Sequence, residues 1–332
     1  MPTFTFNSLQ DAFIDGLHQV IDSPHYSIAP RGHRSKEVLA HSFRIANPLD
    51  RLIRISARRT NVVFNFAEFL WYVSGSREVD AIAYYAPRMR TYSPDGQYLY
   101  GTAYGPRLFG SSSAFPSQWE RVLATLEDDP DTKRAILSIY ESSETGAPRS
   151  ADVACTLALQ FLIRDDSLHA ITYMRANDAY IGVVSDVFSF TMIQEMLARR
   201  LGVGVGSYTH FAGSYHVYEE NLASARNVLS DSSRTDSSSK PCPPMPDGDP
   251  ADALKVVLRW EQLLRRNEST LDAKSLARLP IDSYWQDILR LLELYRQIAH
   301  EKRCDIQMLD GLPDAYSDAL LNRWPLHFRS RI

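Results

Sequence analysis

Four side chains capable of chemistry bracket one stretch of the sequence, residues 154–202. Cys155 stands at the head of an apolar run, Arg175 and Asp178 follow further on, and Asp186 precedes a segment with apolar residues at helical spacing. A thiolate is a nucleophile, a guanidinium binds phosphate or carboxylate, and a carboxyl group accepts hydrogen bonds or carries a proton. A thiol, a guanidinium and two carboxylates thus surround one predicted hairpin and one predicted helix start.

The elements that must position these groups are predicted from the same stretch. Apolar and β-branched runs predict two strands, over 156–163 and 168–174, joined by a turn. Gly182 then falls in a predicted loop. A helix is predicted to begin just after Asp186 and to end at Gly202, where glycine favours a C-cap.

Each of these groups has an ordinary alternative role when it is taken singly. Cys155 is also compatible with a small buried hydrophobe, as most single cysteines are. Asp186 is compatible with a helix N-cap, and Arg175 with Asp178 with a surface ion pair that contributes little. Only their combination points to a function.

Glu68 lies within a segment, residues 61–75, that is predicted to be a buried helix. The residues at helical spacing from it do not form a solvated face; they are Phe64, Asn65, Trp71 and Tyr72. A carboxylate in such surroundings must be paired or protonated. Glu68 is therefore a candidate general acid or base.

The chain divides by composition into a catalytic core over residues 1–230, a Ser/Pro-rich linker over 231–252 that is predicted to be mobile, and a helical segment over 253–332 packed on the core. The other elements predicted from periodicity are a helix over 4–21, a strand ending near Ile45, a helix from about 117 to 128, and helices over 254–264 and 284–302.

Bulk composition excludes several classes of protein. The 332 residues are 44% hydrophobic and carry a formal net charge of −4, without a basic run interleaved with aromatics, so a nucleic-acid polymer is not expected as substrate. Three scattered cysteines indicate neither a disulfide framework nor a metal site. No apolar stretch predicts a membrane span or a signal peptide, and a reducing cytoplasm is the expected location.

Several motifs, with their spacing kept, resemble the thymidylate synthase family. The nucleophilic cysteine precedes a QF strand, an R-x-x-D-x-x-x-G segment follows, and an H-x-Y segment and an E-x-L-W helix complete the set. The matching residues are Cys155, Gln160, Phe161, Arg175, Asp178, Gly182, His216, Tyr218, Glu68, Leu70 and Trp71, together with a tyrosine–glycine pair at Tyr104 and Gly105. The resemblance covers about residues 25 to 225 and fails afterwards.

The resemblance implies an α+β fold with a large mixed β-sheet flanked by helices, to which this chain adds a helical C-terminal segment. It also implies a role for each matching residue. Cys155 would add to C6 of a pyrimidine nucleotide, with Glu68, Asp186 and Tyr104 as further catalytic groups, and cationic neighbours would lower the pKa of the thiol. The co-substrate would be 5,10-methylenetetrahydrofolate, without a metal.

Substrate-binding roles follow in the same way. The phosphate would be held by Arg175 and by Arg31, with Arg34 as a rival to the latter. In a homodimer, Lys133 and Arg134 would reach the partner's site.

The other residues implied by the family contact the nucleotide or the folate. His216 and Tyr218 would bind the sugar, and Gln160, Ala176 and Asn177 would line the nucleotide. Asp178 and Gly182 would bind the folate.

Departures from the family pattern predict the substrate. Asp186 replaces an asparagine that recognises uracil, and a carboxylate suits the amino edge of cytosine better. Ala176 replaces a serine near the sugar and leaves space for a 2′-hydroxyl, so CMP is favoured over dCMP. Tyr84 and Tyr85 stand where the family has a tryptophan near the folate, which favours entry of water. We predict a CMP 5-hydroxymethylase; a dCMP hydroxymethylase, a thymidylate synthase and a non-catalytic nucleotide-binding module are the alternatives.

Overall fold

A computed structural model describes residues 4–112, 116–146, 150–232, 242–302 and 304–328. Across these residues seven strands form one mixed sheet in the order β1-β3-β7-β6-β5-β4, with β2 pairing beside β3. The strands are β1 (Phe4–Phe6), β2 (Tyr26–Ile28), β3 (Ser35–Ile45), β4 (Ile136–Ser138), β5 (Thr156–Arg164), β6 (Ser167–Asp178) and β7 (Gly204–Tyr218). The expected α+β fold with a large mixed sheet is confirmed.

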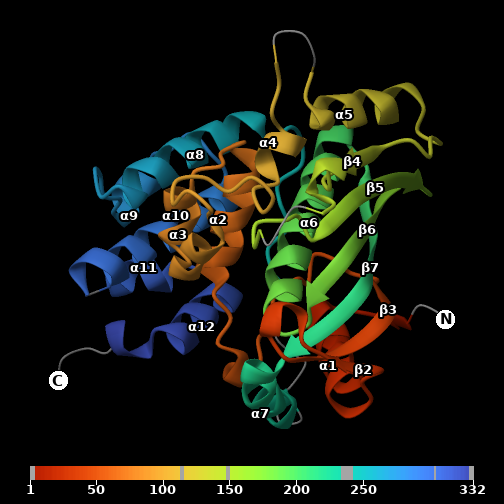
Figure 1. Cartoon of the computed structure of the whole chain (residues 1–332). Helices are drawn as coiled ribbons and strands as arrows, with labels where there is room; N and C mark the ends of the chain where they lie inside the picture. Colours follow the sequence, from red (N-terminus) through yellow and green to blue (C-terminus); the bar gives the residue numbers. More distant parts are fainter. Residues whose placement is uncertain (1–3, 113–115, 147–149, 233–241, 303, 329–332) are drawn as a thin grey trace.

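Helices gather on one face of this sheet. They are α1 (Leu9–Asp22), α2 (Val62–Val73), α3 (Val79–Ala83), α4 (Gly105–Leu108), α5 (Gln118–Asp128), α6 (Gly182–Leu201), α7 (Leu222–Ser232), α8 (Ala251–Arg265), α9 (Ala273–Leu276), α10 (Ser283–Arg296), α11 (Ile306–Asp310) and α12 (Asp314–Arg323). Figure 1 shows α6 between the sheet and a second layer made of α2, α3 and the C-terminal helices.

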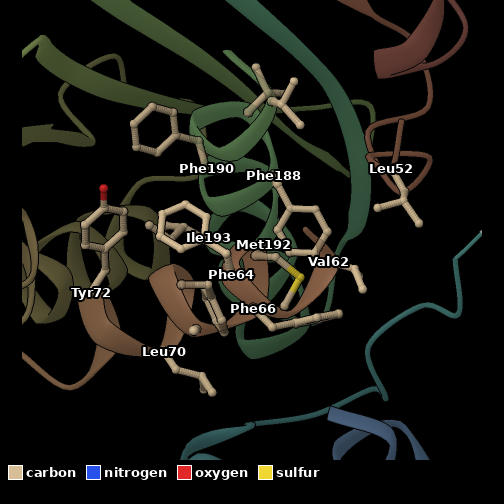
Figure 2. Packing of buried hydrophobic residues seen from close by; sticks show 14 of the residues in the cluster. Leu52, Val62, Phe64, Phe66, Leu70, Tyr72, Phe188, Phe190, Met192 and Ile193 are labelled. Atoms are coloured by element: carbon tan, nitrogen blue, oxygen red, sulfur yellow. The ribbon is translucent and has the colours of Figure 1, made fainter. Parts of the chain in front are cut away.

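Helix α6 is buried along most of its length because it is covered on both sides. Its sheet side meets β6 and β7, and its other side meets α2, where the ring of Phe188 lies edge-on to Phe66 with centroids 5.0 Å apart. Figure 2 shows the apolar side chains of α2 and α6 pointing toward one another. Gly202 ends α6 in the left-handed conformation, at φ 70°, as the sequence predicts.

Two predicted boundaries are wrong. The opening helix predicted over 4–21 begins only at Leu9, because residues 4–6 form β1, which pairs parallel with β3. Helix α6 begins at Gly182 instead of after Asp186, so Gly182 is not in a loop and Asp186 is not an N-cap. The carboxylate of Asp178 accepts the N–H groups of Tyr180 and Ile181 just before α6, whose N-cap residue, Ile181, has no side-chain capping bond.

The C-terminal helices pack against the core. The hydroxyl of Tyr284 contacts the sulfur of Met192 in α6, 3.5 Å away, and the ring of Tyr316 lies edge-on to Phe66 in α2. Residues 233–241 of the predicted linker lie outside the described residues. Residues 242–250 are not a free linker, because Cys242 and Met245 are buried and the N–H of Met245 donates to the carboxylate of Glu195.

Backbone irregularities interrupt β3 and β5, and the two strands between them, β7 and β6, make a close contact. Ala40 in β3 has φ 54°, and the pairing of β5 with β6 shifts between Thr156 and Ala158. In β7, a Cβ on Gly213 would lie 3.0 Å from the backbone oxygen of Arg175 in β6, so a larger residue there would push the two strands apart slightly. Such bulges bend strands and re-aim side chains. Cys155 and Arg175 lie beside this bend.

Candidate active site

Cys155 directly precedes β5, and Arg175 in β6 lies against it. The backbone N–H of Arg175 donates to the oxygen of Cys155. Its guanidinium donates to the carbonyl oxygens of Ala154 and Val153 and lies 3.6 Å from the sulfur of Cys155. The predicted alternative, an ion pair between Arg175 and Asp178, is not formed. The guanidinium is instead fixed by backbone oxygens beside the thiol.

The pKa of the Cys155 thiol is raised, contrary to our expectation that cations would lower it. Burial is the largest cause, and the negative charge of Asp186 adds to it, whereas Arg175 and Arg31 lower the pKa by less. The predicted contribution of Lys133 and Arg134 is not among the strongest influences within the described chain. The thiol of the nucleotide-free protein is thus protonated at neutral pH.

Tyr104 lies against Thr156, the residue that follows Cys155. Its hydroxyl oxygen accepts from the backbone N–H and the hydroxyl of Thr156, at 3.4 and 3.3 Å. Its ring stacks on Tyr72 of α2 with centroids 5.1 Å apart. Tyr104 therefore ties the end of β5 to α2.

Glu68 projects from α2 and is only 6% exposed. Burial raises its pKa first, and the negative charge of Asp186 raises it further, while a hydrogen bond of 3.2 Å from the hydroxyl of Ser189 and the charge of Arg88 lower it. The sequence predicts a carboxyl group that is either paired or protonated by desolvation, and burial here raises the pKa of Glu68 to about 8, which favours the proton.

Asp186 lies one turn into α6, and its own contacts differ from those of a cap. The Nδ2 of Asn177 donates to its Oδ2 at 2.7 Å. Burial raises the pKa of Asp186, the bond from Asn177 lowers it, and the charge of Asp178 raises it. Cys155, Glu68, Asp186, Tyr104 and Asn177 are linked by these charge interactions and hydrogen bonds, and we call this group of residues the acid pocket.

Gly182 and Asp178 border this pocket at the start of α6. A Cβ on Gly182 would lie 3.1 Å from Nδ2 of Asn177 and 3.3 Å from Oδ2 of Asp186, so any larger residue would press on the two atoms that form their hydrogen bond. The Oδ1 of Asp178 accepts the N–H groups of Tyr180 and Ile181. Asp178 thus fixes the chain entry into α6 in addition to its predicted role toward the folate.

The residues predicted to hold sugar and phosphate lie around the same thiol. Asp178 pairs in register with His216 on β7, whose ring lies edge-on to Tyr218 with centroids 5.1 Å apart. The charge of Arg31 acts on both Cys155 and Tyr218. This favours Arg31 over Arg34 as the residue facing the thiol, because the charge of Arg34 is not among the main influences on either group.

Ala176 sits in β6, opposite Ser214 of β7 in the sheet register. The hydroxyl of Ser214 donates to the carboxylate of Glu37 at 2.5 Å and lies 3.5 Å from Nδ1 of His216. Ala176 is therefore a strand neighbour of the residues predicted to bind the sugar. Its methyl group leaves the surface there without a hydroxyl.

Three predicted residues are not brought to Cys155 within the chain. Gln160 lies five residues further along β5, roughly 16 Å in extended strand. Its amide donates to the backbone oxygen of Lys133 and accepts from the hydroxyl of Tyr173. Lys133 and Arg134, which precede β4, are exposed. This group lies on the sheet face that the helices leave uncovered.

One cavity beside the acid pocket was not predicted. It has a volume of about 700 Å³ and is lined by α2, α6, α7, α12, the segment before α2 and the segment after α3. Four arginines line it, and we call it the arginine cavity: Arg58, Arg59, Arg88 and Arg323. Among the described residues none of the four forms an ion pair with a carboxylate.

The arginines of this cavity are held in place by aromatic and backbone groups. The guanidinium of Arg58 lies 4.8 Å from the ring centre of Tyr180. Burial lowers the pKa of Arg58, Tyr180 and Asp178 raise it, and the charge of Arg323 lowers it. Arg59 and Arg323 each donate to the other's backbone oxygen. The sequence signal that could have found this site is the Arg58–Arg59 pair before α2.

Two further searches concern other kinds of site. Among the described residues no group of three or more histidine, cysteine, aspartate or glutamate side chains is arranged to hold a metal ion. Within the same ranges, every helix is too short or too polar to cross a bilayer.

A cysteine flanked by arginine, next to a buried and a half-buried carboxyl group on an α+β frame, is an arrangement suited to nucleophilic chemistry on an anionic ligand. The chain belongs to the thymidylate synthase family, whose match spans residues 11–240 and thus more than half of the sequence. The family expectation from the sequence motifs is confirmed, and the match extends further toward both ends than the motifs indicated.

Three phage proteins named deoxyuridylate hydroxymethyltransferase are similar to this chain. The protein of Bacillus phage SP01 is 32% identical over 228 residues, which is 66% of this chain and 59% of the relative. Those of Pseudomonas phage M6 and Delftia phage PhiW-14 are 31% and 29% identical, over 53% and 56% of this chain and 50% and 54% of the relatives. The chain thus matches a little over half the length of these relatives.

Proposed function

We propose that this protein is a folate-dependent pyrimidine nucleotide 5-hydroxymethylase that converts CMP, and dCMP less readily, to the 5-hydroxymethyl nucleotide. One observation carries the proposal: a carboxyl group, Asp186, lies in the pocket of Cys155 and is held there by Asn177. Family membership supports one-carbon transfer to C5, and the names of the phage relatives support a hydroxymethyl product. The finer resemblance, to CMP 5-hydroxymethylases of mildiomycin-type nucleoside-antibiotic biosynthesis, is part of this proposal.

Base recognition follows from the chemistry of Asp186. Cytosine presents an amino donor at position 4 and a nitrogen at position 3 that becomes basic when C6 is attacked. The ionised carboxylate of Asp186 accepts from the amino group, whereas its protonated form, which burial favours, donates to the ring nitrogen as that nitrogen becomes basic. An asparagine in its place would suit uracil instead. The Asp186→Asn variant should therefore shift preference toward uracil nucleotides, and an unchanged preference would remove Asp186 from base selection.

The folate fits the residues beside the acid pocket. The arginine cavity is within the usual size of small-molecule sites and is rich in positive charge. Folates end in glutamyl carboxylates, which guanidinium groups bind well. Arg58 and Arg323 would hold these carboxylates, and Asp178 would face the pterin. When bound, 5,10-methylenetetrahydrofolate supplies a one-carbon unit at the oxidation level of formaldehyde.

The chain's own groups then handle the nucleophile and the protons. Cys155 gives up its thiol proton as its sulfur, beside the guanidinium of Arg175, adds to C6, and that proton balances the charge that moves onto C5 and the base edge held by Asp186. C5 would then bond to the one-carbon unit and lose its proton, and the unit's bonds to the folate nitrogens would break. The ionised form of Glu68 would accept a proton from the water that adds to the exocyclic carbon, and departure of the sulfur as thiolate would restore the aromatic ring.

A second copy of this chain is the partner we propose. The face of the sheet opposite the helices carries one exposed large apolar side chain on each of five neighbouring strands: Leu39, Phe211, Tyr173, Leu157 and Ile136, each 36–42% exposed. Such a face favours burial against an identical face. Lys133 and Arg134 lie at its edge, far from Cys155 of the same chain, as groups serving a partner's site would.

Mixing two inactive variants tests this homodimer. A Cys155→Ala chain and a Lys133→Ala/Arg134→Ala chain, refolded together, should regain about a quarter of wild-type activity if the basic pair acts across the interface. No recovery in the mixture, while each variant alone sediments as a dimer, would show that the pair acts within one chain or not at all.

The mass of the product tests the reaction. CMP, dCMP and dUMP are each incubated with the full chain and the folate, and the nucleotide is weighed by mass spectrometry. A gain of CH2O on CMP is expected. A net gain of CH2 would indicate methylation, and reaction with dCMP alone would restrict the substrate to the deoxynucleotide.

Hydroxymethylation of dUMP is the second candidate. The names of the three phage relatives favour it, and a protonated Asp186 could donate to the oxygen at position 4 of uracil. Reaction with dUMP in preference to both cytosine nucleotides in the same assay would decide for this candidate.

A further inference from the structure

Asp186 is the end of a chain of hydrogen bonds that runs into the sheet. The Nε2 of His210 lies 3.1 Å from Oδ1 of Asn177, and the hydroxyl of Tyr208 lies 3.0 Å from Nδ1 of His210. Because Nδ2 of Asn177 donates to Asp186, Oδ1 of Asn177 must accept, so His210 donates from Nε2. Its Nδ1 then accepts from Tyr208. The three links donate in one direction, toward Asp186.

This chain is sealed from solvent. Asn177 is 3% exposed, and His210 and Tyr208 are fully buried. Burial, followed by the neighbouring His41, lowers the pKa of His210 to about 3, so the ring stays neutral with one N–H at physiological pH. A neutral, buried imidazole between fixed partners has one tautomer. The orientation of the Asn177 amide is therefore set from behind by His210.

The amide in turn sets which oxygen of Asp186 meets the base. Oδ2 of Asp186 accepts from Asn177, and Gly182 packs closely against this contact. Oδ1 is the oxygen left for the group at position 4 of the pyrimidine. When Asp186 is ionised, Oδ1 accepts from the amino group of cytosine; when it is protonated, Oδ1 donates to the oxo group of uracil.

We propose that Asn177, oriented by His210, is a positioning residue that makes Asp186 select cytosine over uracil. The inference rests on the proposed function, in which Asp186 faces the base. The hydrogen bond from Asn177 stabilises the ionised carboxylate and so opposes the effect of burial on the pKa of Asp186. Preference for cytosine should rise with pH as Asp186 ionises, and Asn177 moves that rise to lower pH.

Other groups around Asp186 also influence its charge. Glu68 and Tyr72 face it from α2, Asp178 from β6, and Tyr104 from the loop before α4. Arg88 faces it from the segment after α3, Cys155 from the start of β5, and Tyr208 from β7. Glu68 titrates with Asp186, and the wild-type midpoint belongs to both. All of these groups are present in every variant below, so differences between variants report the Asn177 link alone.

Nucleotide binding without folate tests the proposal. The dissociation constants of CMP and UMP are measured by calorimetry from about pH 5 to about pH 9, and their ratio is followed. In Asn177→Leu the midpoint of the rise in cytosine preference should move up by about one pH unit. His210→Phe should move it in the same direction by less, because the amide then keeps its donor but loses its fixed orientation.

Two further variants separate positioning from simple loss of structure. His210→Gln, which offers an N–H to Asn177, should keep the wild-type midpoint. His41→Phe, a buried histidine whose Nε2 has no recorded partner, is the matched control and should also leave it unchanged. If Asn177→Leu does not fold, the comparison of His210→Phe with His210→Gln decides alone.

The outcomes distinguish this inference from the proposed function. Equal midpoints in wild type, Asn177→Leu and His210→Phe would overturn the positioning role, even if the wild-type protein makes hydroxymethyl-CMP. A shifted midpoint in a protein that forms no hydroxymethyl product would leave the positioning role standing and reject the proposed reaction. A shift of equal size in His41→Phe would also overturn it, since the effect would then be a general one of the core.

Discussion

The acid pocket and the arginine cavity are neighbours that hold opposite charges. In the acid pocket, Glu68 is buried and Asp186 is half-buried, and desolvation raises the pKa of both. In the arginine cavity, Arg58 and Arg323 are crowded without a carboxylate partner among the described residues, and burial lowers the pKa of both. Arg88 lines the cavity and also acts on both carboxyl groups.

The same physical cause has different consequences in the two regions. A carboxyl group removed from water avoids the cost of desolvation by taking up a proton. The carboxyl groups of the acid pocket can therefore donate and accept protons near neutral pH. A guanidinium remains charged in proteins, so the cavity can be neutralised only by an anion. The comparison assigns proton transfer to the first region and binding of an anionic co-substrate to the second.

The largest effect is expected from the nucleophile of the acid pocket. Cys155→Ala should lower turnover by at least about 10³-fold, because no other group can add to C6. Binding of CMP, measured by calorimetry, should stay within a few-fold of wild type. An unchanged turnover would instead support the alternative in which the chain is a nucleotide-binding module without covalent chemistry.

Proton transfer in the acid pocket is tested by Glu68→Gln, which keeps the shape of the side chain and removes its acid–base capacity. Turnover should fall by about 10²-fold, while the KM for the nucleotide changes little. Ser189→Ala, which removes the hydrogen bond to Glu68 and keeps its carboxyl group, is the control and should cost much less. Equal losses in the two variants would argue that Glu68 acts only in packing.

The same substitution makes a prediction about stability. The folded-state pKa of Glu68 is raised, so its contribution to stability is fully present below the ordinary pKa of a glutamate and is lost as pH rises through the raised value. Glu68→Gln should therefore lose less stability on alkalinisation, by about 2 kcal/mol. Urea unfolding at acid and alkaline pH measures this, and parallel pH profiles for both proteins would contradict it.

The arginine cavity is tested by Arg58→Gln/Arg323→Gln, which removes two positive charges and keeps much of the side-chain volume. The KM for the folate should rise about tenfold, with kcat and the KM for CMP little changed. The control is Arg200→Gln. Arg200 lies on α6 away from the cavity, and the substitution breaks its exposed ion pair with Asp249. If the KM for CMP rose and the KM for the folate did not, the cavity would be assigned to the nucleotide phosphate instead.

The two regions also differ in how far the sequence could predict them. The acid pocket is built from α2, β5, β6 and α6, whose periodicity and turn residues are local signals, and its groups were predicted by type. The hydrogen bond between Asn177 and His210 was not predicted, because it joins residues 33 positions apart and depends on the parallel register of β6 with β7. Similarly, β1 was missed because its three residues become a strand only by pairing with β3.

The arginine cavity depends on contacts that are more distant still. Arg59 and Arg323 exchange hydrogen bonds across 264 positions, and nothing local indicates that α12 returns to this place. The pKa of Cys155 was predicted in the wrong direction for a related reason. Arginines near the thiol are visible as motifs, whereas the depth of its burial and the approach of Asp186 are properties of the folded chain.

The smallest effect is expected at the border of the acid pocket, where Ala176 lies beside Ser214. Ala176→Ser adds a hydroxyl where we expect the sugar, so it should crowd a 2′-hydroxyl and shift the CMP:dCMP ratio of kcat/KM about fivefold toward dCMP. Ala158→Ser, the same change on β5 of the same sheet, serves as the control. The preference for cytosine over uracil should not change in Ala176→Ser, because Asp186 is untouched. If Ala176→Ser keeps the wild-type CMP:dCMP ratio, Ala176 does not select the sugar. The acid pocket would then select only the base.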